Sequence, residues 1–136
     1  MEIKVEHLGG LQFEVQARNF RLLSDQPVES GGYDEGMTPP ELLLASLGSC
    51  AAFYAAQYRR KRKLATEGTR VNVTAEKAAA PARLDNFVIQ VDAPVELTAE
   101  QRAGVIEAVH HCLIHNTLLH PPAISIAVET PAIPAL

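Results

Sequence analysis

The sequence predicts an α+β fold, in which strands and helices occupy separate stretches of the chain. Three observations support this: alternating apolar and polar residues near the amino terminus, a long apolar helix pattern after a capping box, and a second succession of strands and helix. The order strands, long helix, strands, helix, strand departs from strict βαβ alternation. We expect one domain over residues 1–136, since this length can bury its own core and no linker-like segment divides it.

The amino-terminal strands are predicted from alternation. Ile3 and Val5 alternate with polar residues, and residues 7–10 supply a Gly-Gly turn. Residues 11–17 alternate again, so the two runs predict a hairpin with one half-buried face. A short third strand is expected over residues 20–23, before a loop rich in Gly, Asp and Ser over residues 24–37.

The first helix has a clear start signal. Thr38 as N-cap, Pro39 at the first helical position and Glu41 at the third form a capping box. Apolar residues then repeat at helical spacing: Leu43, Leu47, Cys50, Ala51 and Tyr54. The helix is expected to run to about Ala65, with a left-handed cap at Gly68. The basic run of residues 58–63 is then its solvated end, where cations complement the helix dipole.

The rest of the chain predicts strands, a helix and a last strand. Val71, Val73 and Ala75 indicate one strand, residues 78–86 a loop, and residues 87–95 the longest strand. A second helix begins at Thr98, where Gln101 completes a capping box. Its apolar stripe is Val105, Val109, Cys112 and Leu113. Residues 123–129 predict a last strand and residues 130–136 a tail broken by proline.

Composition disfavours several classes of function. The chain is 47% hydrophobic and 21% charged, as globular proteins are, and its net charge of −4 opposes binding to nucleic acid or an anionic membrane. With no Trp and 5% aromatic residues, it has few platforms for stacking bases. No signal-peptide core and no membrane-length apolar run are found, so we expect a cytoplasmic protein.

Cys50 and Cys112 lie on the apolar faces of the two predicted helices. In a reducing compartment such thiols are either packed as small hydrophobes or act as a redox couple. If the helices pack on each other, the two sulfurs could meet. Cys50 lies about three turns past the N-cap, beyond the reach of the helix dipole, so its ionisation would need a nearby cation.

Histidines gather around Cys112, at positions 110, 111, 115 and 120. His111 and His115, spaced i and i+4, could hold zinc together with Cys112 if the helix continues through them. No acidic third ligand accompanies them, so solvated or helix-capping histidines are the preferred interpretation, and we expect no metal.

Taken together, residues 31–53 (GGYDEGMTPPELLLASLGSCAAF) and 110–118 (HHCLIHNTL) resemble the two cysteine motifs of the OsmC/Ohr superfamily. They look more like the general OsmC-like branch than the Ohr branch. The order of elements also matches, so the resemblance covers nearly the whole chain. It implies an intertwined homodimer, in which two central helices are wrapped by antiparallel strands from both chains.

The resemblance also implies an activity: a thiol-dependent peroxidase that reduces organic hydroperoxides in oxidative or osmotic stress, with no cofactor and with an external dithiol as reductant. Cys50 matches the peroxidatic cysteine and Cys112 the resolving one. Family members hold the first sulfur as a thiolate with an arginine, which a glutamate orients. The early hairpin turn has no arginine here, so Arg18 and Arg21 are the nearest substitutes, and Glu41 matches the glutamate with a shift of one residue.

A second interpretation stays open. The chain would then be a non-catalytic dimer of the same fold that binds a small apolar ligand or partner, with its two thiols packed and inert.

Overall fold

A computed structural model describes residues 1–130 and confirms the α+β class. Strands β1 (Lys4–Gly9), β2 (Gln12–Ala17) and β3 (Phe20–Ser24) form an antiparallel sheet in that order. After a 3-10 turn (Val28–Ser30) come helix α1 (Pro39–Lys61), the antiparallel pair β4 (Arg70–Ala79) and β5 (Ala82–Asp92), and helices α2 (Ala99–His110) and α3 (Leu113–Leu119).

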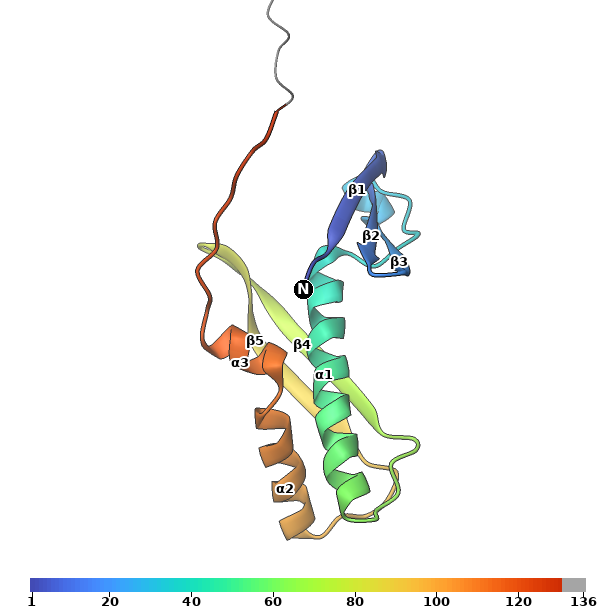
Figure 1. Cartoon of the computed structure of the whole chain (residues 1–136), viewed down its shortest axis with the longest axis vertical. Helices are drawn as coiled ribbons and strands as arrows, with labels where there is room; N and C mark the ends of the chain where they lie inside the picture. The colour runs from blue at the N-terminus through green and yellow to red at the C-terminus, as the bar shows by residue number, and fades with distance from the viewer. Residues whose placement is uncertain (131–136) are drawn as a thin grey trace, which may run out of the picture.

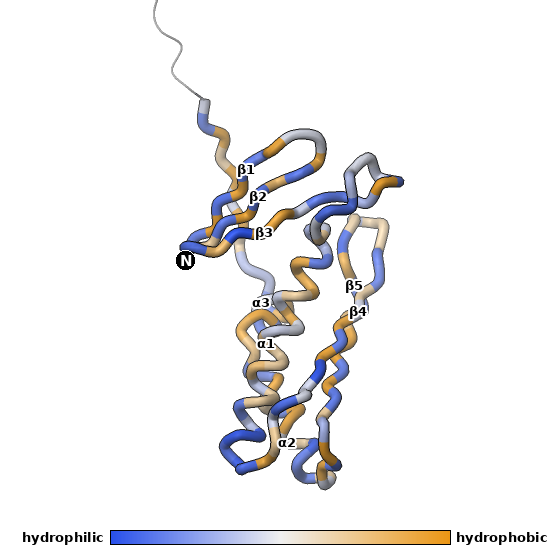
Figure 2. Tube along the Cα trace, turned by 90° about the vertical axis from the view of Figure 1, so that its right-hand side faces the viewer, coloured by the Kyte–Doolittle hydropathy of each residue, from blue (hydrophilic) through white to orange (hydrophobic). Residues whose placement is uncertain are grey.

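Helix α1 is the central element (Figure 1). The hairpin β4–β5 and helices α2 and α3 pack against it, whereas the three-stranded sheet lies beyond its amino-terminal end. Hydropathy alternates along β4 and β5, so the apolar side chains of this hairpin fall on one face (Figure 2). The buried apolar residues are few: Leu47, Ala51, Ala55, Val105 and Cys112.

Both predicted helix starts are confirmed. The Thr38 side chain accepts a hydrogen bond from the Glu41 N–H, and the Glu41 carboxylate accepts one from the Thr38 N–H. Thr98 and Gln101 form the same reciprocal pair at the start of α2. Each capping box satisfies backbone donors that the first helical turn leaves unpaired, which is why the sequence signal was specific.

The predicted end of α1 is wrong by several residues. The helix ends at Lys61, and Lys63 adopts the left-handed conformation (φ 58°) that the sequence assigned to Gly68. The Leu64 N–H reaches back to the Arg59 carbonyl, so the carbonyls of the last turn are satisfied here. Gly68 (φ 76°) lies instead in the turn before β4.

The predicted loop over residues 78–86 is also wrong, because most of it is strand. Pairing of β4 with β5 continues to Ala79 and Ala82, and only Ala80 and Pro81 form the turn. Pro81 has no N–H for a ladder, and the turn is a position where none is needed. At its other end β5 stops at Asp92, before Pro94, and not at residue 95.

The second predicted helix is divided into two. α2 ends at His110, and Cys112 is the N-cap of the separate helix α3. Cys112 is therefore buried at a helix junction, while Leu113, which was assigned to the same apolar stripe, is exposed.

The predicted last strand over residues 123–129 is not formed. This segment is extended and unpaired, and Figure 1 shows it running away from the other elements. Ile124, Ile126 and Val128 are 83%, 90% and 86% exposed. Alternating apolar residues form a strand only where a neighbouring strand is available for hydrogen bonding. Within residues 1–130 no strand pairs with this segment. The predicted tail lies, after Thr130, outside the described residues.

The loop between β3 and α1 is organised around the buried carboxylate of Asp25. Burial by itself would raise the pKa of Asp25, but four hydrogen bonds outweigh it and lower the pKa below its ordinary value. The donors are the backbone N–H groups of Gln26, Tyr33 and Glu35 and the side-chain amide of Gln12.

Because the folded state lowers this pKa, the ionised Asp25 stabilises the fold above the ordinary Asp pKa of 3.8, and the contribution is lost as the pH falls through the lower folded value. We expect Asp25→Asn to flatten the loss of unfolding free energy below about pH 4, measured by urea denaturation. Asp34→Asn, at an exposed position of the same loop, is the control. An equal flattening in both variants would contradict this role.

Candidate functional site

The structure brings the two cysteines together. Cys50 lies on α1 and Cys112 at the start of α3, and α3 packs against α1. Both thiols are free, and Cys50 lies near enough to Cys112 to raise the pKa of the Cys112 thiol. Residues that are far apart in the sequence thus form one two-thiol site.

Cys112 is fully buried, and its sulfur accepts a hydrogen bond from the His115 N–H at 3.4 Å. Burial raises the pKa of the Cys112 thiol, and the neighbouring Cys50 thiol raises it further. The backbone N–H groups of His115 and Ile114 act in the opposite direction but do not outweigh these effects. Cys112 is therefore held as a neutral thiol at neutral pH.

Cys50 is the more accessible of the two, since its side chain is only partly buried. A reagent from solvent meets this sulfur first, and the product of that reaction forms next to Cys112. The arrangement fits a thiol that reacts followed by a thiol that resolves.

This asymmetry predicts a selective alkylation. In native reduced protein, iodoacetamide is expected to modify Cys50 at least tenfold faster than Cys112, because burial and protonation both slow Cys112. Peptide mass spectrometry over time measures the two rates. The urea-unfolded protein is the control, in which the rates should converge; equal rates in the native protein would contradict the assignment.

The two other predicted site residues are not next to the thiols within this chain. The Glu41 carboxylate accepts hydrogen bonds from the N–H and hydroxyl of Thr38, which lower the pKa of Glu41. Arg18, in the turn between β2 and β3, places its guanidinium 4.9 Å from the Phe20 ring centre. Arg21 pairs with Glu14 at 3.1 Å. Glu41 is in the first turn of α1, whereas Arg18 and Arg21 belong to the three-stranded sheet, which lies beyond the amino-terminal end of α1 (Figure 1).

His111 and His115 do not share one helical face, which the disfavoured zinc interpretation required. α2 ends before His111, so His111 and His115 lie on different elements, and the His111 ring is 3.9 Å from Glu107. The His115 ring instead lies 5.3 Å from that of His110. In residues 1–130 no group of three or more His, Cys, Asp or Glu side chains could hold a metal.

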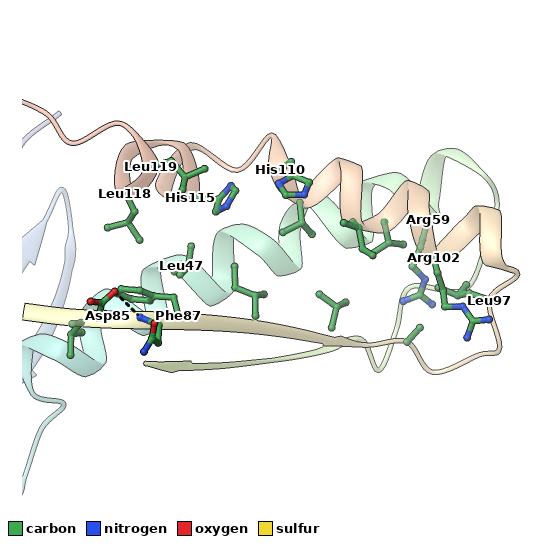
Figure 3. A pocket seen from close by; sticks show the side chains of 18 residues that line it. Leu47, Arg59, Asp85, Phe87, Leu97, Arg102, His110, His115, Leu118 and Leu119 are labelled. Atoms are coloured by element: carbon green, nitrogen blue, oxygen red, sulfur yellow. Dashed lines mark hydrogen bonds between the residues drawn. The ribbon is translucent and has the colours of Figure 1, made fainter. Parts of the chain in front are cut away.

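A cavity of about 860 Å³ lies between α1, β5, α2 and α3, and neither cysteine lines it. Figure 3 shows Leu118, Leu119 and Phe87 toward one end and Arg59, Arg102 and Leu97 toward the other. Most of its lining side chains are apolar.

Arg59 is a buried residue of this cavity that was not predicted from the sequence. The basic run was expected to be solvated, but Arg59 is 0% exposed while its neighbour Arg60 is exposed. The signal was present in the spacing, because Leu47, Ala51, Ala55 and Arg59 follow one another every four residues. Residues at that spacing share one helix face, and this is the face that α1 buries.

The fold and the site together define an α+β protein with a long helix and a pair of interacting thiols. A family model described as OsmC-like protein matches residues 32–127. This chain belongs to that family. The predicted membership of the OsmC superfamily is therefore confirmed. In residues 1–130 no helix has the length and apolarity to cross a membrane.

Solved structures have folds similar to that of this chain. A Psychrobacter arcticus protein named for the osmotic stress and detoxification response has a TM-score of 0.78, 26% identity and 85% coverage of each chain. An organic hydroperoxide resistance protein OsmC of Legionella pneumophila scores 0.67 at 19% identity, covering 87% of this chain and 89% of that one. An organic hydroperoxide resistance protein of Elizabethkingia anophelis scores 0.65 at 21%, covering 86% and 87%. No curated protein matches the chain.

Proposed function

We propose that this protein is a thiol-dependent peroxidase that reduces organic hydroperoxides and protects against oxidative or osmotic stress. The observation that carries the proposal is the contact between Cys50 and Cys112, of which the first is accessible and the second buried and neutral. The names of the Legionella and Elizabethkingia relatives support the substrate class.

The reaction proceeds in three balanced steps. The Cys50 thiolate attacks one oxygen of the hydroperoxide, the O–O bond breaks, and the leaving alkoxide takes up a proton to become an alcohol. Cys50 is left as a sulfenic acid. The Cys112 thiol attacks its sulfur, an S–S bond forms, and water leaves. An external dithiol then reduces this disulfide by exchange and is itself oxidised. No cofactor is needed, since sulfur supplies the chemistry.

The thiolate requires a cation, which Arg18 would provide with Glu41 as its orienting partner. Within one chain Glu41 lies in the first turn of α1 and Arg18 in the turn between β2 and β3, so we include in the proposal a second copy that brings them to Cys50. Apolar residues near Cys50 in sequence, such as Leu47 and Phe53, favour an alkyl hydroperoxide over hydrogen peroxide.

Thiol counting tests the proposal. Reduced protein mixed with one equivalent of cumene hydroperoxide is expected to lose both free thiols and release one equivalent of cumyl alcohol, while its circular dichroism is unchanged. Retention of both thiols in folded protein would reject the peroxidase. It would leave the alternative, a non-catalytic dimer that binds a small apolar ligand, which the cavity without a lining cysteine favours.

Exposed apolar segments at both ends of the described chain support a second copy. Residues 123–129 are extended and unpaired. On β1, the apolar side chains of Val5 and Leu8 are also exposed. Unpaired edges with apolar faces favour association with another strand. We therefore propose a homodimer in which these edges pair between chains.

Sedimentation analysis checks the dimer. We expect the wild-type protein to sediment as a dimer and Ile126→Asp to shift it toward monomer by on the order of tenfold or more in Kd, because a charge would be buried at the interface. Glu129→Gln, which removes a charge from the same segment without burying one, is the control. A monomeric wild-type protein would overturn the homodimer.

A further inference from the structure

The buried guanidinium of Arg59 is incompletely satisfied. Its Nη1 donates to Thr69 Oγ1, but Nε and Nη2 are buried without a hydrogen-bond partner. The side chain is 0% exposed. Among residues 1–130 no carboxylate lies within ion-pair distance of it. A buried cation with open donors and no counter-charge is costly, and an anion would relieve that cost.

The buried side chain of Arg59 lines the apolar cavity, and the guanidinium of Arg102 lines it as well. Figure 3 shows Arg59 and Arg102 at the same end. Asp85, the acidic residue of the lining, lies toward the opposite end and is already paired with Arg83 at 2.6 Å. The cavity therefore has a cationic end with free donors and an opposite end whose acid is neutralised.

The middle of the cavity is apolar. Its walls include Ile89 and Val91 of β5, and Val105 and Val109 of α2. The volume of about 860 Å³ lies within the range of small-molecule sites, which combine apolar walls with a few placed polar groups. An inorganic anion would satisfy the arginines but leave these walls uncovered, whereas a neutral hydrocarbon would leave the arginines unpaired.

We propose that the cavity binds an aliphatic carboxylate, whose head group pairs with Arg59 and Arg102 and whose chain lies along β5 and α2. A carboxylate matches the planar donors of a guanidinium and forms strong charge-assisted hydrogen bonds. This binding site is separate from the two thiols and does not depend on the peroxidase reaction.

Binding of dodecanoate to the assembled protein, measured by isothermal titration calorimetry below the micelle concentration, tests the site. Dodecanol has the same chain without charge and dodecyltrimethylammonium reverses the charge. We expect saturable binding of dodecanoate, at least about tenfold tighter than of either matched probe. Binding of all three probes with equal affinity, or no saturable binding of dodecanoate, would overturn the proposal; the second result would mean that protein side chains of a second copy fill the cavity.

Variants locate the head group. Arg102→Gln, at an exposed position, is expected to weaken dodecanoate binding about tenfold and leave dodecanol binding unchanged. Arg59→Gln should weaken it at least as much, provided that circular dichroism shows a native fold. Arg60→Gln removes an exposed neighbouring cation and is the control. Wild-type affinity in Arg102→Gln, or equal weakening in Arg60→Gln, would reject the assignment.

The peroxidase and the carboxylate site are tested independently. Cys50→Ser is expected to bind dodecanoate with wild-type affinity, because neither cysteine lines the cavity. Loss of dodecanoate binding in this variant would contradict a site separate from the thiols, whereas failure of the thiol-counting experiment would leave the binding result unaffected.

Discussion

Replacing Cys50 by serine is expected to abolish reduction of cumene hydroperoxide, with a loss on the order of a thousandfold or more. A serine hydroxyl keeps the size of the side chain but is not a nucleophile toward the O–O bond, and Cys112 is too buried and protonated to replace it. Alcohol release in the presence of excess dithiothreitol measures the rate.

Cys112→Ser is the matched comparison and should behave differently. The first turnover is expected to proceed, since Cys50 remains accessible, and the sulfenic acid should then persist and be trapped by dimedone. Turnover would slow because no neighbouring thiol resolves the intermediate. If Cys50→Ser kept wild-type activity, or if Cys112→Ser lost even the first turnover with the fold intact, the assigned roles would be wrong.

Leu47→Ala is expected to destabilise the protein by about 2–5 kcal/mol. Leu47 is 1% exposed, lies one turn before Cys50 on α1 and also borders the large cavity. Its removal therefore loses buried apolar area and enlarges a void next to the helix that holds the thiol. Urea denaturation at a fixed protein concentration measures the change in unfolding free energy.

Leu43→Ala is the control for this prediction. It removes the same atoms one turn earlier on the same helix, but Leu43 is 36% exposed. The loss should be roughly half of that for Leu47→Ala or less, since less apolar area is removed from water on folding. Equal losses at the two positions would show that α1 does not bury the face described here.

The parts of the fold that the sequence predicted best are those with local chemical signals. Thr38 with Glu41, and Thr98 with Gln101, each specify a helix start within four residues, and the structure forms both. The α+β class and the amino-terminal hairpin followed equally from short-range alternation.

The errors occur where distant residues decide the outcome. The alternation of Ile124, Ile126 and Val128 is compatible with a strand, but pairing needs a neighbouring strand, and none within residues 1–130 pairs with this segment. Residues 78–86 looked like a loop because Ala and Pro are weak strand formers, yet pairing between β4 and β5 extends through them. Tertiary pairing outweighs propensity in both segments.

The candidate site was predicted in part. Cys50 and Cys112 were selected by their motifs, whereas the break between α2 and α3, which makes Cys112 the N-cap of α3, was not predicted. Arg59 was not predicted because all of residues 58–63 were expected to be solvated. Its spacing of four residues from Ala55 places it on the buried face of α1.

We propose that Cys50 and Cys112 form a redox pair within one chain. Non-reducing peptide mapping after one equivalent of cumene hydroperoxide tests it most directly. We expect a single cross-linked species that joins the Cys50 and Cys112 peptides, in protein that keeps the mass of one chain under denaturing conditions. Two unlinked peptides with free thiols, or a disulfide between two chains, would contradict it.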